Sequence, residues 1–192
     1  MASYASAVLP FVLAAHRAPA RLAALDDALD AAVVCAVGRR ASTAQGRALL
    51  GLWERSFAPA LPPVDDDALV AFAALLRAAP AADEDGLPPP VSAHLPPLFG
   101  AVGRRAGLTA RQTAYVFLLS HAKALVSAAV RASVMGPYQA QRMLASPGLQ
   151  ALLDGVVSRE WDTPVEEAGQ SVPVMDLWIG RHELLYSRIF NS

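Results

Sequence analysis

Four histidines and one cysteine are the side chains of this 192-residue sequence best suited to bind a metal ion or to act as a nucleophile. They are His16, His94, His121, His182 and Cys35. No two histidines are three or four residues apart, and none stands at a metal-ligand spacing from the cysteine or a carboxylate. His182 and Glu183 are adjacent, so on a helix they point in different directions. The spacing predicts structural or interface histidines, not a metal site.

The sequence also lacks the short motifs of common catalytic sites. No G-x-x-x-x-G-K-[ST] run is present, and Lys123 is outside any glycine-rich loop, which argues against nucleotide binding by a P-loop. There is no G-x-S-x-G and no Cys/His nucleophile pattern. The acidic runs VDDDA and ADEDG fall in expected loops or helix starts, where the helix dipole favours them. A helical enzyme would need distant polar groups, such as His121 with Glu160 or Asp154, to meet in one cavity.

The composition indicates more apolar surface than a monomer of this size needs. Hydrophobic residues make up 54% of the chain and charged residues 17%, whereas roughly 25% charged is usual. The longest apolar stretches are too short for a membrane span or carry His121 and Lys123. A net charge of −1 argues against nucleic acid, and the single cysteine fits a cytoplasmic location. We therefore expect protein partners to cover the excess apolar surface.

Helices separated by proline and glycine must position these groups, because β-branched alternation is nearly absent. The pattern predicts an all-α, single-domain bundle of about seven to nine helices over residues 1–192. The expected helices cover residues 18–42, 42–57, 67–80, 95–107, 108–136, 138–146, 147–160 and 177–192. Ser42 or Thr43 is the expected N-cap of the helix at 42–57. Gly46 lies inside this helix, which makes sense if another backbone packs against it. Residues 81–90 are the clearest exposed loop, acidic and rich in proline.

Residues 108–136 are expected to form the central helix of the bundle. Thr109 and Gln112 make a capping-box pattern, and the Gly136-Pro137 pair closes the segment. The helix is apolar on nearly every face, which is typical of an enclosed helix. Lys123 and Arg131 lie roughly on one face of it. They either reach water or pair with an acid such as Asp154 or Glu160, or they line an inter-subunit surface.

Three stretches together resemble the F-type urease accessory proteins. The first is RRASTAQGRALLGLW, which is similar to the family run RAS-x-x-QG-x-x-LL through Ala41, Ser42, Gln45, Gly46 and Leu49. The second, VSAAVRASVMGPYQAQRML, is similar to SAAVRLG-x-x-GP-x-x-AQ-x-x-L through Ser127, Ala128, Ala129, Arg131, Gly136, Pro137 and Gln141. The third is the ending, PVMD followed by RHELLYSRIFNS, which looks closest to the fungal branch. The resemblance covers roughly Leu22 to Ser192.

One family motif has no counterpart in the sequence. Family members begin with a P-x-G-x-F/Y-x-H/Y-S-x-G-L-E stretch, and nothing like it occurs here. We expect the sequence to start after that motif, through an internal start, an alternative transcript or an incomplete gene model.

The resemblance implies an all-helical protein that is not an enzyme and that helps to insert nickel into apo-urease. It implies a complex with an accessory GTPase (UreG) and a scaffold (UreD/UreH), control of that GTPase, and a homodimer. No cofactor is expected on this chain alone, because the complex handles the nickel. The alternatives are a truncated, partly functional relative, a generic helical interaction scaffold, and a helical enzyme with an unrecognised pocket.

The C-terminal segment 176–192 is the expected partner-docking segment. Its pattern fits either the last core helix or a plug for a partner, and its Tyr and Arg content is typical of interfaces. The candidate partner-binding residues are Arg181, His182, Glu183, Tyr186, Ser187, Arg188 and Phe190. The family-motif positions with an expected interface or packing role are Ser42, Gln45, Gly46, Lys123, Ser127, Arg131, Gly136, Pro137 and Gln141.

Overall fold

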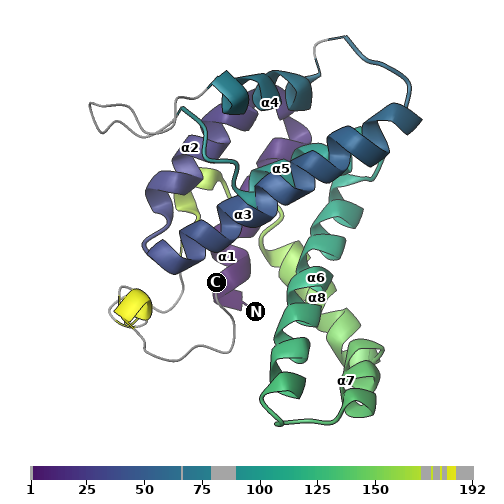
Figure 1. The fold of residues 1–192 in the computed structure, drawn as a ribbon. Helices are drawn as coiled ribbons and strands as arrows, with labels where there is room; N and C mark the ends of the chain where they lie inside the picture. The colour runs from purple at the N-terminus through teal and green to yellow at the C-terminus, as the bar shows by residue number, and fades with distance from the viewer. Residues whose placement is uncertain are drawn as a thin grey trace.

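The computed structural model describes residues 2–65, 67–78, 90–169, 174, 178 and 181–184, and the regular elements in these ranges are helices (Figure 1). Eight α-helices and no strand are present there, which confirms the all-α prediction. The helices are α1 (Ala2–Arg17), α2 (Leu22–Ala32), α3 (Ala36–Leu52), α4 (Ala68–Ala78), α5 (Leu95–Arg105), α6 (Ala110–Arg131), α7 (Pro137–Leu144) and α8 (Pro147–Arg159). Short turns named η2 (Trp53–Phe57), η4 (Val165–Glu167) and η5 (His182–Leu184) follow some of them. The predicted loop 81–90 lies outside the described residues, apart from Pro90.

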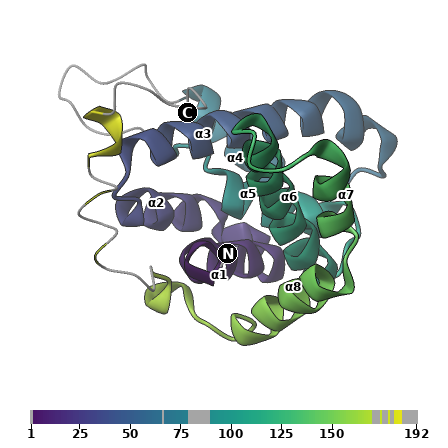
Figure 2. The ribbon, with the colours of Figure 1, turned by 90° about the horizontal axis from the view of Figure 1, so that it is seen from below.

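Helices α1 and α5 form the centre of the bundle, and α3 crosses α5 (Figures 1 and 2). The contact between α1 and α5 is close, because a Cβ on Gly100 would lie 2.2 Å from the carbonyl oxygen of Val12. One buried apolar cluster joins α1, α2, α4 and α5, and a second joins α1, α6 and α8. The sequence pattern did not predict α1 as a helix, yet it contributes to both clusters.

The long apolar helix lies to one side of this centre, which corrects the prediction. Helix α6 buries one face only, through Thr113, Ala114, Phe117, Leu118, Ala122 and Val126. Its outer face leaves Val116 and Leu125 exposed. The helix also ends at Arg131, five residues before Gly136. The N–H of Val134 donates to Ala129 and that of Ser133 to Val130, while Ser133 takes a φ of 58°. This Schellman-type ending, with serine at the left-handed position, stops the helix early.

By length and composition, α6 is the one helix of the described ranges that could cross a membrane. A third of its most apolar window is buried inside the protein. It packs against α1, α5, α7 and α8, as a helix of a bundle does. The exposed side chain of Lys123 lies in the middle of α6, where a bilayer would disfavour a charge.

The second correction concerns the start of α3. The predicted helix 18–42 is interrupted at Val33, and α3 begins at Ala36 with Cys35 as its N-cap. The Cys35 sulfur accepts a hydrogen bond from the N–H of Gly38 at 3.2 Å. Ser42 is therefore an interior residue of α3 and not a cap. The capping box of Thr109 and Gln112 is present at the start of α6, as predicted.

Candidate functional site

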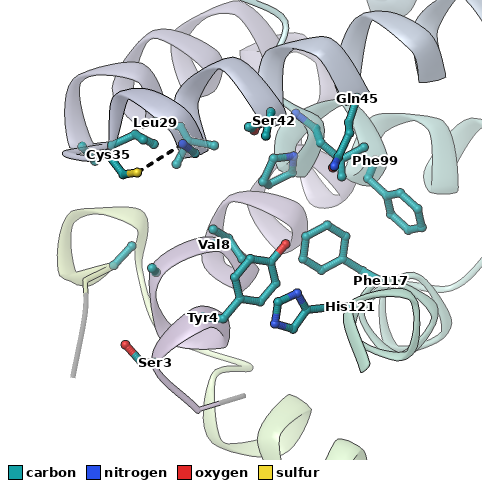
Figure 3. Close-up of a pocket in the computed structure, with 18 of the residues that line it drawn as sticks. Ser3, Tyr4, Val8, Leu29, Cys35, Ser42, Gln45, Phe99, Phe117 and His121 are labelled. Carbon is teal, nitrogen blue, oxygen red and sulfur yellow. Dashed lines mark hydrogen bonds between the residues drawn. The ribbon is translucent and has the colours of Figure 1, made fainter. Parts of the chain in front are cut away.

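An apolar cavity of about 670 Å³ opens between α1, α3 and α6 (Figure 3). Helix α3 presents one face to it through Gly38, Ala41, Ser42, Gln45 and Leu49, which are spaced by three or four residues. Two of these, Ser42 and Gln45, are positions of the family motif in the sequence. Cys35 lies at one end of the cavity, and Ala168 and Gly169 border another side. The motif face of α3 is thus a wall of this cavity.

Aromatic side chains form the opposite wall. The ring of Tyr4 from α1 stacks on His121 from α6, with centroids 3.6 Å apart and planes 6° from parallel. Phe117 lies one turn earlier on α6, 6.0 Å from Tyr4, and meets the edge of Phe99 from α5 at 5.3 Å. Figure 3 shows these four rings gathered on one side of the cavity. Because they come from three helices, this wall depends on the packing of α1, α5 and α6 together.

Burial keeps the titratable groups of this wall uncharged at neutral pH. It raises the pKa of Tyr4 to about 12 and lowers the pKa of His121 to about 4. No aspartate, glutamate, lysine or arginine is found among the described residues that line the cavity. A cavity with neutral, mostly apolar walls suits an apolar side chain better than a charged ligand or a metal ion.

A buried polar network fixes the position of α3 beneath the cavity. The Asp26 carboxylate of α2 accepts hydrogen bonds from the backbone N–H groups of Ser92, Ala93 and His94, at 2.6, 3.0 and 2.6 Å. His94 is fully buried, and its Nε2 lies 2.8 Å from Asp30 Oδ1. These contacts attach the segment before α5 to α2.

Ser42 joins this network from α3. Its hydroxyl oxygen lies 3.0 Å from Nδ1 of His94 and accepts the N–H of Leu95 at 3.3 Å. Because a carboxylate can only accept, Nε2 of His94 carries the proton shared with Asp30, and a neutral ring accepts at Nδ1 from the Ser42 hydroxyl. The predicted motif residue Ser42 thus has a packing role that ties α3 to the start of α5.

The order Ser42–His94–Asp30 has the residue types of a hydrolase triad, but its surroundings favour a structural role. Ser42 lies in the interior of α3, where neighbouring backbone N–H groups are used by helix hydrogen bonds and cannot form an oxyanion hole. The Ser42 oxygen also already accepts the Leu95 N–H. Asp30 pairs with Arg39 in addition to His94. The network holds helices together and engages the serine oxygen in hydrogen bonds with His94 and Leu95.

The polar pairs expected for a helical enzyme do not meet. His121 stacks on Tyr4, whereas Glu160 accepts from Arg159 and Thr163, and Asp154 pairs with Arg111. His16 is buried, with Nε2 2.8 Å from the carbonyl oxygen of Leu108. Across the described residues, no group of three His, Cys, Asp or Glu side chains could hold a metal ion.

Three of the seven predicted partner-binding residues of the C-terminal segment lie within the described residues. In η5, His182 Nδ1 lies 3.5 Å from the sulfur of Cys35, and Glu183 forms an ion pair of 2.6 Å with Arg40. Arg181 is exposed and precedes this turn. The predicted residues Tyr186, Ser187, Arg188 and Phe190 lie outside the described residues. The described turn therefore rests on the start of α3, through Cys35 and Arg40.

The second group of motif residues lies along α6 and α7, outside the set of described residues that line the cavity. Lys123 and Ser127 are exposed on α6, where Arg131 donates to the Ser127 hydroxyl at 3.2 Å. Gly136 caps α7 and Pro137 is its first residue, where a missing N–H costs nothing. Gln141 is exposed on the same helix. Asp154 pairs with Arg111 and Glu160 with Arg159, and the exposed side chain of Lys123 reaches water. An inter-subunit role for Lys123 stays a prediction.

An exposed apolar surface accompanies these residues, and the motif search missed it. The exposed apolar side chains are Leu125, Val134, Tyr138 and Met143, and we call the region of α6 and α7 that carries them the α6–α7 surface. Tyr138 is 87% exposed, which is unusual for a large aromatic side chain. The signal that could have revealed this surface is the low charge of residues 124–138. Figure 1 shows α6 and α7 at the end of the molecule remote from α2 and α4.

Comparisons with known proteins agree with these observations. The UreF family model matches residues 1–148. A urease accessory protein UreF-like protein of Schizosaccharomyces pombe is 35% identical, over 96% of this chain and 74% of that protein. Urease accessory protein F of Oryza sativa subsp. indica is 28% identical over 96% of this chain, and urease accessory protein 6 of Cryptococcus neoformans is 26% identical over 90%.

The chain spans 65% of the length of the rice protein and 63% of the Cryptococcus protein. No solved structure matches it. The resemblance stated from the sequence motifs is confirmed by the family model and by the fungal and plant relatives. With three quarters of its length matched by that model, the chain belongs to the UreF family of urease accessory proteins.

Proposed function

We propose that this chain assists the insertion of nickel into apo-urease by binding and regulating the accessory GTPase UreG together with the scaffold UreD/UreH. The match of the UreF family model to residues 1–148 is the observation that carries this proposal. The sequence contains no P-loop, so the GTPase activity belongs to a partner. The chain itself acts through surfaces, in the cytoplasm, and not as an enzyme.

Two surfaces are assigned to partners. The C-terminal segment 176–192 binds the scaffold, because its Tyr, Arg and Phe content is that of an interface hot spot. The α6–α7 surface binds a second copy of the chain. Its support is the exposure of Leu125, Val134 and Tyr138 on a helix pair that also carries the motif residues Gly136 and Pro137.

Nickel is cargo of the complex in this proposal and is not held by this chain alone. The neutral, apolar walls of the cavity support this, since Ni²⁺ prefers nitrogen, oxygen or thiolate ligands in a set. Among the described residues, Cys35 and His182 come nearest to such a set, and they supply two ligands. Any nickel path therefore includes partner residues.

Complementation of a cell that has urease but lacks its F-type accessory protein is the decisive experiment. Restored urease activity, with recovery of UreG and UreD/UreH in a pull-down with nickel and GTP, is the expected result. Recovery of neither partner would reject the proposal. Recovery of partners without urease activity would identify a truncated, partly functional relative. A generic interaction scaffold would bind other proteins but not these two.

The α6–α7 assignment has its own test. Tyr138→Asp should convert a dimer into a monomer in light scattering, because a charge is placed at the centre of an apolar contact. Ala48→Asp, on the exposed side of α3, is the matched control and should leave the oligomeric state unchanged. A native chain that is monomeric at high concentration would reject this assignment.

A further inference from the structure

We propose that the apolar cavity between α1, α3 and α6 is a binding site for a neutral small molecule that has an apolar ring system and a hydrogen-bond-accepting oxygen. The site goes beyond the function in urease maturation and does not depend on the protein partners proposed above. Three observations support it: the size of the cavity, polar side chains that face it without a hydrogen-bond partner, and a described lining without charged side chains.

The cavity is large enough for a ligand of several rings. Its volume is about 670 Å³, which lies within the range of about 300–1,000 Å³ that is usual for small-molecule sites. An apolar cavity of about 150 Å³ already holds benzene. Tyr4, Phe99 and Phe117 supply aromatic surface to one wall, and the short side chains of Ala41 and Ala124 line the cavity from α3 and α6. A single apolar side chain of a protein partner would therefore fill only part of this space.

Two polar side chains of the aromatic wall face the cavity without a hydrogen-bond partner. Figure 3 shows the hydroxyl of Tyr4 directed into the cavity, and no described residue accepts a hydrogen bond from it. His121, which stacks on the same ring, also makes no hydrogen bond to a described residue. Polar groups that are removed from water normally have a partner. Because a protonated phenol donates, the Tyr4 hydroxyl calls for a ligand oxygen that accepts.

The α3 wall offers a further polar contact. The amide of Gln45 lines the cavity and makes no hydrogen bond to a described residue. Ser42, one turn earlier, is instead engaged with His94 and the N–H of Leu95. Since Gln45 and Tyr4 belong to opposite walls, a ligand that reaches both is held in one orientation.

The lining selects for a neutral ligand. No aspartate, glutamate, lysine or arginine occurs among the described residues that line the cavity. Burial keeps Tyr4 protonated and His121 uncharged at neutral pH, because it raises the first pKa and lowers the second. Bringing an ionic group into such surroundings without a counter-charge is unfavourable. A ketone or an alcohol with an apolar ring system fits these walls, whereas a carboxylate, a phosphate or a metal ion does not.

Binding of prodan to the full chain tests the site. Prodan is a neutral naphthyl ketone whose fluorescence shifts to the blue in apolar surroundings. We expect saturable binding with blue-shifted emission. Ala41→Phe fills the cavity from α3 and should abolish this binding. Ala44→Phe, which is exposed on the same helix and outside the lining, is the matched control and should leave it unchanged.

Tyr4→Phe tests the assigned hydrogen bond, because it keeps the ring against His121 and removes only the donor. We expect prodan to bind about threefold to tenfold more weakly, which is the loss of one neutral hydrogen bond. Tyr115→Phe on α6, outside the lining, is the control. Anilinonaphthalene sulfonate is an anionic probe of similar size and should bind far more weakly than prodan.

Each result has a defined meaning. Lack of saturable prodan binding by the native chain overturns the proposal, and so does binding that survives Ala41→Phe, because the probe then lies elsewhere. Equal binding of the sulfonate, or of prodan by Tyr4→Phe, contradicts the assigned ligand chemistry. If Ala41→Phe fails to fold by circular dichroism, Ala124→Phe fills the same cavity from the exposed side of α6 and replaces it. Since no protein partner is present, the outcome is independent of the complementation test.

Discussion

Gly46 of α3 lies directly against the carbonyl oxygen of Ala93, so that a Cβ on the glycine would sit 2.0 Å from that oxygen. Ala93 itself is fully buried and takes a left-handed φ of 71°. The same residue donates its N–H to Asp26. The glycine of the family motif is therefore the point at which α3 and the segment before α5 touch backbone to backbone.

This contact predicts that Gly46→Ala destabilises the protein. Alanine favours a helix by up to about 1 kcal/mol over glycine, but a forced backbone shift costs about 1–3 kcal/mol, and a contact with backbone atoms lies at the upper end of that range. We expect a net loss of about 2 kcal/mol, or roughly 4–8 °C in Tm, in thermal unfolding. Gly51→Ala in the same helix is the control, because its Cβ would meet only the end of the flexible Arg55 side chain. An unchanged Tm for Gly46→Ala would show that the segment at Ala93 can move.

The Asp26 carboxylate gives a second stability prediction. Asp26→Asn replaces an acceptor of three backbone N–H groups by an amide whose NH₂ faces one of them. Hydrogen bonds to charged groups contribute about 1.5–3 kcal/mol each, so we expect a loss of about 3 kcal/mol in urea unfolding. Asp27→Asn, exposed on the same helix, should change the free energy of unfolding by less than about 0.5 kcal/mol. Equal effects of the two substitutions would contradict this role.

The lowered pKa of His121 predicts a pH dependence of stability. The pKa is about 4 in the folded chain and 6.5 when unperturbed, mainly because burial disfavours the imidazolium. Between these values the unfolded chain binds more protons. The contribution of neutral His121 is therefore fully present above pH 6.5 and is lost as the pH falls towards 4. Titration of the His121 ring signals by NMR should give the lowered value.

The matched variant is His121→Phe, which keeps a ring against Tyr4 and removes the titrating group. Its free energy of unfolding should change less between pH 7 and 5 than that of the native chain. A His121 that titrates near 6.5 in the folded protein would mean that the ring is not buried in the cavity wall.

Local signals explain which parts of this fold the sequence predicts. The end of α5 is predicted, because Gly107 occupies the left-handed position of a Schellman ending. The end of α6 is not, since Ser133 occupies the same position and carries no glycine signal. Gly46 was correctly expected to face a backbone. Cys35 was not expected to cap α3, because the usual capping residues are Ser, Thr, Asp and Asn.

The candidate site depends on contacts that a linear pattern does not contain. His94 meets Ser42 and Asp30 across 52 and 64 residues of sequence, and Tyr4 meets His121 across more than a hundred. Helical periodicity places each residue on a face of its own helix but does not say which faces meet. Two motif residues, Ser42 and Gln45, lie on the face of α3 that lines the cavity. The aromatic wall opposite this face could not be predicted from the sequence, because its rings come from three different helices.

The final prediction concerns the C-terminal segment as a docking element. Deletion of residues 181–192 removes the exposed Arg40–Glu183 ion pair and the Cys35–His182 contact, and both clusters of buried residues remain. An exposed ion pair contributes less than about 1 kcal/mol, so the helical signal in circular dichroism should persist. Binding to UreD/UreH should be abolished in a pull-down. The charge-reversed pair Arg77→Glu with Glu54→Arg is a control that alters another exposed ion pair, retains the whole segment and should still bind. Loss of the entire fold on deletion would instead identify residues 181–192 as part of the core.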